Sequence, residues 1–188
     1  SSTSVAIPDC AKTITQLLEQ PGDASCLPKI TAATKESQCK PYYASGTSGP
    51  LATLTLAATA VIPTGALLLC DGELGLNIVL KPGIKIIPKQ AFSSCCTPDS
   101  LVSLRDTSAL EQISPSAFYG TRVSLTGTYD SLAFIGTAAF RSGSGTISLV
   151  KQQSSAATAV FADPYTMHHF DGHVHIQDPH SGGKKFHV

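Results

Sequence analysis

The sequence of 188 residues carries little charge. Only 14% of its residues are Asp, Glu, Lys or Arg, against roughly 25% in an ordinary soluble domain. The formal net charge is zero, and no cluster of Lys or Arg is present. Nucleic acids and anionic membranes are bound mainly through clustered positive charge, so we expect neither as a partner. A nearly neutral surface gives little repulsion between copies, which favours self-association.

Long apolar segments and catalytic motifs are missing as well. The longest apolar run, Ala57–Leu69, is interrupted by Thr59, Pro63 and Gly65, so we expect no membrane span. No Gly-rich phosphate loop or nucleophile elbow occurs, and the 13 acidic residues form no recognisable acid–base pair. We therefore expect no enzymatic activity and no cofactor. The chain opens on Ser-Ser-Thr-Ser without a signal pattern, which indicates a mature N-terminus.

Six cysteines are present without any CxxC pair, and none has a histidine nearby in sequence. This pattern argues against a zinc finger or a thioredoxin-like redox site. The even count and wide spacing predict three disulfides and a secreted, extracellular protein. The lone asparagine, Asn77, starts no N-linked sequon, whereas Thr47–Ser48, Ser142–Thr146 and Ser154–Thr158 are candidates for O-glycosylation.

A short phrase of the form Ile-x-x-x-Ala-Phe recurs and organises the chain. Its copies are Ile62–Leu67, Ile87–Phe92, Ile113–Phe118, Ile135–Phe140 and a degenerate Ala156–Phe161, whose starts lie 25, 26, 22 and 21 residues apart. Alternating apolar pairs precede the copies and follow the last: Leu54/Leu56, Ile78/Leu80, Val102/Leu104, Val123/Leu125, Ile147/Leu149 and Val174/Ile176. Such periodicity is typical of a solenoid whose coils stack through a parallel strand ladder.

We predict an α+β repeat fold: a solenoid of five to six coils over residues 49–165. The Ile and the Ala-Phe pair of each phrase should point inward, with the small Ala letting adjacent coils approach. The alternative is an irregular β-sandwich with chance similarity among its turns.

The phrase following a short Leu/Ile/Val strand resembles the BspA-type leucine-rich repeats over about residues 50–162. The resemblance implies a leucine-rich-repeat fold and a surface or secreted protein that binds partners or surfaces, and it supplies no catalytic residues. The short chain and the His-rich end depart from the family.

Residues 1–48 lack the repeat and are predicted to form a disulfide-linked helical cap and linker. Cys10–Glu19 places Ala11, Ile14, Leu17 and Leu18 on one helical face, with Asp9 as its cap. A weaker helix is expected over Leu27–Glu36. Such a cap would shield the first coil.

Equivalent positions in successive coils suggest one disulfide. Cys70 and Cys95 each lie four residues after the Ala of a phrase, so stacking should bring them within bonding distance. Cys96 then pairs with one of Cys10, Cys26 and Cys39, and the other two pair together; the sequence does not choose among these, and free buried thiols are the alternative.

All six histidines fall within residues 166–188, the predicted terminal strand and tail. His173 and His175 would share one face of a strand, beside Asp171, in a geometry that can chelate Zn or Cu. The string from Phe170 to His175 looks like the Asp-x-His-x-His metal strand of amidohydrolases. That strand opens a barrel of about 250 residues, whereas 13 residues remain here. We assign no metal site and keep these three residues as candidates, because alternation predicts exposed histidines on a last coil.

No polar cap follows Ile176, so the last strand is expected to be an open edge. We predict a non-enzymatic structural protein that self-assembles end to end into a filament or coat, with Val174, Ile176 and Phe186 at the interface. The alternatives are a tail that folds over the edge, or a recognition module that binds a protein or glycan on its sheet face.

The expected outward positions of the sheet form a hydroxyl-rich ladder without Trp, Tyr or Arg, which argues against strong protein binding. These positions are Thr55, Val79, Ser103, Ser124 and Ser148. Such a ladder could also order ice.

Overall fold

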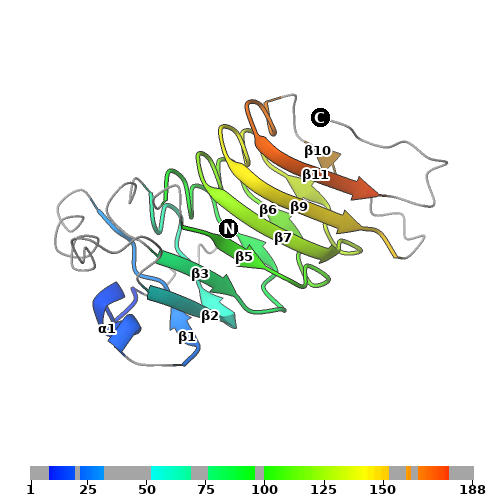
Figure 1. The fold of residues 1–188 in the computed structure, drawn as a ribbon. Helices are drawn as coiled ribbons and strands as arrows, with labels where there is room; N and C mark the ends of the chain where they lie inside the picture. Colours follow the sequence, from blue (N-terminus) through cyan, green and yellow to red (C-terminus); the bar gives the residue numbers. More distant parts are fainter. Residues whose placement is uncertain are drawn as a thin grey trace, which may run out of the picture.

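The computed structural model describes residues 9–19, 22–31, 52–68, 76–95, 100–152, 160–161 and 165–177. They form a parallel β-solenoid of about 4 turns with repeats of ~24 residues (Figure 1). The described chain is mostly β, with one short helix, so the predicted α+β class and the count of five to six coils are wrong.

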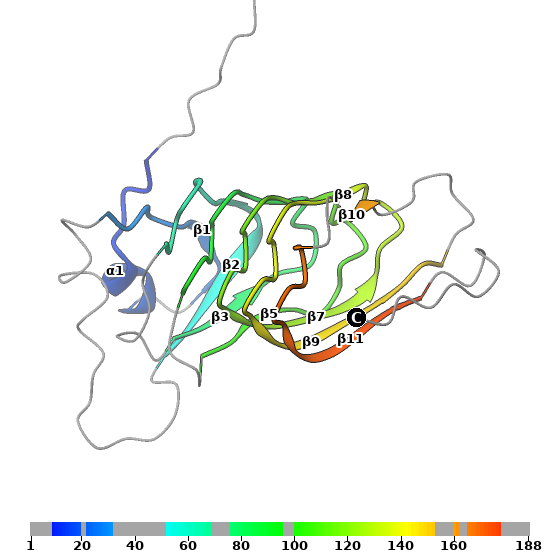
Figure 2. The ribbon, with the colours of Figure 1, turned by 90° about the horizontal axis from the view of Figure 1, so that it is seen from above.

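Two parallel sheets line opposite sides of the coils (Figure 2). The larger sheet has the order β1 (Ala24–Cys26), β2 (Ala52–Val61), β3 (Leu76–Leu80), β5 (Val102–Leu104), β7 (Arg122–Thr128), β9 (Ser144–Val150) and β11 (Asp171–Gln177). The smaller sheet has the order β10 (Val160–Phe161), β8 (Phe134–Ile135), β6 (Gln112–Ile113) and β4 (Ile86–Ile87). Every strand pair is parallel, because each coil runs in the same direction as its neighbour.

The recurring phrase builds the core between the sheets, as predicted. The isoleucines at 62, 87, 113 and 135 and the alanines at 66, 91, 117 and 139 are all buried. Phe92, Phe118 and Phe140 form a stacked column with ring centroids 5.6 and 5.4 Å apart, and Phe170 ends the column edge-on at 6.3 Å. The repeated phrase therefore places like side chains over one another in successive coils.

The alternating pairs of the larger sheet also face inward, and all but the half-buried Val174 are buried. One register differs from the prediction: Leu125 pairs with Ile147, so Ser124 lies beside Thr146 and Ser148 lies beside Thr126. The shift follows from Gly145, which occupies the place opposite Val123. A Cβ at Gly145 would lie 2.0 Å from a backbone oxygen of β7, and its φ of +112° suits glycine.

The prediction for the degenerate fifth phrase, Ala156–Phe161, is wrong in its register at the described pair Val160–Phe161. Phe161 pairs with Ile135 and so occupies the Ile position of the phrase. The Ala-Phe position is taken by Thr166 and Met167, both buried, and the Phe140 N–H donates to the Thr166 carbonyl at 2.9 Å. The backbone hydrogen bonds between coils therefore define this core position, and in the last coil residues that differ from the phrase fill it.

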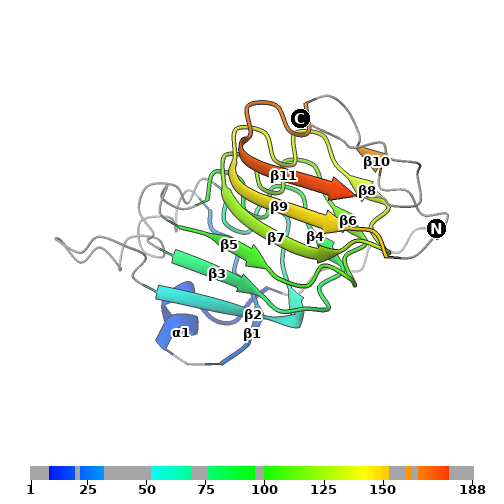
Figure 3. The same ribbon diagram turned by 45° about the vertical axis from the view of Figure 1, so that its right-hand side comes forward.

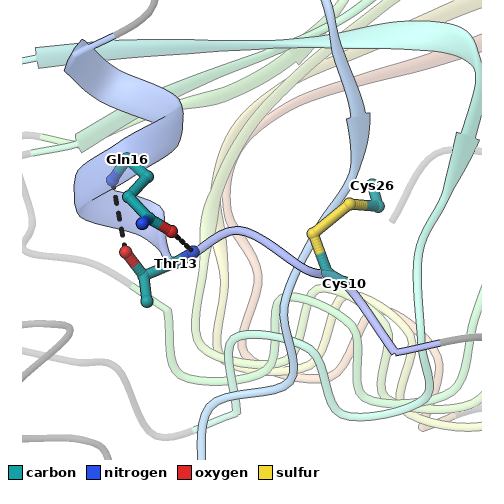
Figure 4. The surroundings of a disulfide bond; sticks show 4 residues. All are labelled: Cys10, Thr13, Gln16 and Cys26. Atoms are coloured by element: carbon teal, nitrogen blue, oxygen red, sulfur yellow. Dashed lines mark hydrogen bonds between the residues drawn. A yellow bond between two sulfur atoms is a disulfide. The ribbon is translucent and has the colours of Figure 1, made fainter.

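In the described part of the N-terminal cap there is one helix, α1 (Ile14–Glu19), which packs beside β2 (Figure 1). Its cap is Thr13 and not Asp9: the Gln16 N–H donates to Thr13 Oγ1 at 3.2 Å, and the Thr13 N–H donates to Gln16 Oε1 at 2.9 Å (Figure 4). This reciprocal capping box starts the helix later than predicted. Ile14 and Leu17 are buried as expected, whereas Ala11 is exposed.

The described part of the second predicted helix, residues 27–31, is not helical. The Leu27 N–H donates to the Val61 carbonyl at 2.9 Å, and the Ile30 N–H donates to the Ala66 carbonyl at 2.8 Å. This segment therefore lies alongside the first coil and forms part of a further coil. Leu27 and Ile30 are buried. Its own backbone hydrogen bonds to that coil replace those a helix would make.

A disulfide joins Cys10 to Cys26, with the Cα atoms 5.6 Å apart, and ties the start of the cap to β1 (Figure 4). This pair is one of those that the sequence left open. Cys95 is also disulfide-bonded. The predicted Cys70–Cys95 bond involves Cys70, which lies outside the described residues, as do Cys39 and Cys96.

Candidate functional site

The outer face of the larger sheet carries a ladder of mostly small, polar residues. One row runs Thr55, Val79, Ser103, Ser124, Thr146 and His173, each beside the next. Its first five members are half-buried by their neighbours, and His173 is exposed. The row thus changes at its last position from short side chains to an imidazole that extends into solvent.

Strand β11 ends the larger sheet and pairs over its whole length with β9, from Asp171 beside Ser144 to Gln177 beside Val150 (Figure 3). The Asp171 N–H donates to the Gly143 carbonyl at 2.9 Å, and the Gln177 carbonyl accepts from the Lys151 N–H at 2.9 Å. Because backbone groups alternate in direction along a strand, the odd-numbered residues of β11 face β9.

The remaining backbone groups of β11, those of Gly172, Val174 and Ile176, face the opposite side. No strand pairs with that side within the part of the chain that the structure describes. In the same described part, β10 ends the smaller sheet at this end of the solenoid. A regular edge of seven residues is a template for another strand. Of the predicted interface residues, Val174 and Ile176 lie on this edge strand, and Phe186 lies outside the described residues.

The other end of the solenoid is finished differently. Strand β1 has three residues, and its register to β2 shifts between Ala24 and Cys26. The Cys10–Cys26 disulfide fixes this short strand (Figure 4). A short, irregular edge is a poor template for pairing. The two ends are therefore unequal, and the regular edge is at the C-terminal end.

The metal candidates lie on the outer face of β11. Asp171, His173 and His175 are all exposed, at alternate positions of the strand. His175 Nε2 is 3.4 Å from Gln177 Oε1. Among the described residues, no three or more His, Cys, Asp or Glu side chains converge in a way that could hold a metal ion. One chain thus offers a pair of imidazoles on one face.

A group of aromatic and imidazole rings lies on the turn before β11, and no sequence motif predicts it. The ring centroids of His168 and His169 are 3.9 Å apart, and the Tyr165 ring meets His168 edge-on at 5.8 Å. Partial removal from water lowers the pKa of His168, and the nearby charges of His169 and Arg141 lower it further. The Ser142 N–H donates to the His168 carbonyl at 2.9 Å, so the turn that contains Arg141 lies next to this group.

No described helix is long and apolar enough to cross a membrane. A hollow at the N-terminal cap is lined by residues that include Asp9, Lys12, Thr13 and Lys29.

The stacked coils and their two parallel sheets define the chain as a parallel β-solenoid. It matches no known protein-family model, and no curated protein or solved structure is detectably similar to it.

Proposed function

We propose that the chain is a non-enzymatic, extracellular structural subunit that self-assembles through the C-terminal end of its solenoid. The observation that carries this proposal is the difference between the two ends. Strand β11 pairs with β9 at seven consecutive positions, and its other edge is unpaired among the described residues. Monomeric proteins blunt such edges with charge, proline, bulges or short strands. At the N-terminal end β1 is short and its register shifts, whereas β11 has seven residues in unbroken register with β9.

The solenoid is also assigned to the BspA-type leucine-rich repeats as part of this proposal. The support is the Ile-x-x-x-Ala-Phe phrase, with its buried Ile, Ala and Phe positions in three successive coils. An extracellular location follows from the even number of cysteines and from the Cys10–Cys26 disulfide. Low charge and a net charge of zero favour close contact between copies.

A proline at position 174 tests the proposal. The Val174 N–H faces the open edge, so Val174→Pro removes a donor to an incoming strand and leaves the pairing with β9 intact. Val174→Ala is the matched control, because it trims the side chain and keeps the N–H. We expect the natural chain and Val174→Ala to form larger species at micromolar concentration in sedimentation velocity, and Val174→Pro to stay monomeric. Equal sedimentation of all three proteins as a 19.5 kDa monomer contradicts the proposal.

A recognition module is the second candidate, and the outer ladder favours it. Ser103, Ser124 and Thr146 form a continuous row of hydroxyl groups, and Val79 separates them from Thr55; such a row suits a glycan more than an apolar protein surface. Binding of the monomer to a glycan array, lost in a Ser103→Leu/Ser124→Leu variant and kept in Val174→Pro, would support this candidate over self-assembly.

A further inference from the structure

We propose that two copies of the chain pair through their β11 strands and hold a zinc ion between them with His173 and His175 of each copy. This inference rests on the proposed self-assembly and specifies which ends meet and what joins them.

The edge of β11 is complementary to itself. Its seven residues, Asp171–Gln177, have Val174 at their midpoint. A two-fold axis perpendicular to the sheet, midway between the Val174 residues of the two copies, pairs the strand with an antiparallel copy over its full length. The outward backbone groups of Gly172, Val174 and Ile176 then meet those of Ile176, Val174 and Gly172. Pairing with β1 instead would match seven residues to three with a shifted register.

The same axis brings the histidines together. His173 of one copy lies opposite His175 of the other, in a pair without mutual hydrogen bonds, where antiparallel strands bring their Cα atoms to about 4.5 Å. Within one strand the two histidines are separated by about 7 Å, since the rise is roughly 3.4 Å per residue. The perpendicular axis keeps all four side chains on the same exposed outer face.

Zinc fits this arrangement better than the pair in a single chain. Zn²⁺ in structural sites takes four ligands in a tetrahedron, and imidazole nitrogen is among its preferred donors. In one copy the described residues offer no group of three or more converging ligands. A second copy raises the imidazoles from two to four and completes the coordination. Because the ion contacts both chains, its binding free energy adds to that of the edge pairing.

The surroundings of β11 allow the site. The neighbouring row on β9 is Thr146 and Ser148, whose short side chains leave room for an ion above the strand. The His175–Gln177 contact, at 3.4 Å, is weak enough for the imidazole to turn toward a metal. The Gly145–Gly172 pairing brings the β9 and β11 backbones close together at the start of the strand, since a Cβ at Gly172 would lie 2.1 Å from the Gly145 oxygen.

The test measures zinc binding and association together. The natural chain is titrated with ZnCl2 by calorimetry and sedimented with ZnCl2 or with EDTA. We expect one zinc ion per two chains and a dimer dissociation constant at least about tenfold lower with zinc than with EDTA. His173→Thr/His175→Thr should lose both effects and still fold, because threonine suits an exposed strand position.

The matched control is His168→Gln/His169→Asn, which removes two other histidines and leaves β11 unchanged. Asparagine tolerates the left-handed backbone at position 169, where φ is +58°. This variant should bind zinc and dimerise like the natural chain.

Two outcomes overturn the inference, and they separate it from the proposed function. If the chain associates equally with zinc and EDTA, and equally in the β11 variant, self-assembly stands and the zinc bridge is refuted. If zinc binds one ion per chain and sedimentation stays monomeric, the bridge is refuted and self-assembly fails as well.

Discussion

Truncating the centre of the phenylalanine column should destabilise the solenoid strongly. Phe118 is fully buried and stacks on Phe92 at 5.6 Å and on Phe140 at 5.4 Å. Burial of such a ring contributes about 1.5–3 kcal/mol, and each ring pair adds about 0.5–1.5 kcal/mol. Since coils pack on both sides, the cavity left in Phe118→Ala has little room to collapse. We expect a loss of about 3–5 kcal/mol in the free energy of unfolding.

Urea unfolding followed by circular dichroism measures this loss. The control is Phe134→Ala, since Phe134 is 37% exposed and lies outside the column; it should cost less than about 1 kcal/mol. Phe118→Leu should fall between them, because it keeps most of the volume and loses the stacking. A cost for Phe118→Ala below about 1.5 kcal/mol, or equal to that of the control, would refute the idea that stacked phrases hold the coils together.

Three further predictions concern the backbone, the cap and the terminal turn. Gly145→Ala should unfold the last coils, because its Cβ would lie 2.0 Å from a β7 oxygen, whereas Gly22→Ala, with φ +144° and no atom within 4 Å, should cost far less; circular dichroism melting compares them. Replacing Cys10 and Cys26 with serine should cost about 3 kcal/mol, since the bond closes a loop of 16 residues, and a cost near zero in urea unfolding would contradict a cap that stabilises the fold. NMR titration should give His168 a pKa below its ordinary 6.5. Its contribution to stability is then present above that pH and is lost as the pH falls through the folded-state pKa; a pKa above 6.5 would reverse this.

The middle of the fold was predictable because its repeat acts through side-chain size and spacing. The Ile, Ala and Phe of the phrase keep a fixed spacing within each copy. Ile87, Ala91 and Phe92, for example, each occupy the buried position that this spacing predicts. The alternation of Val174 and Ile176 with His173 and His175 likewise predicted which side of the last strand faces solvent.

The ends were not predictable for physical reasons. The segment 27–30 has no strand-like alternation, and its non-helical path is fixed by hydrogen bonds to a coil that lies more than 30 residues later. Thr166 and Met167 fill a column position without resembling Ala-Phe, so only stacking reveals them. The register of β9 depends on the close approach of backbones at Gly145, which no apolar pattern encodes.

The measurement that tests self-assembly most directly is sedimentation velocity over a range of micromolar concentrations, with negative-stain microscopy of the same samples. We predict that the natural chain and Val174→Ala form larger species as the concentration rises, and that Val174→Pro sediments as a 19.5 kDa monomer throughout. A natural chain that stays monomeric at every concentration, with and without zinc, would contradict assembly through the C-terminal edge.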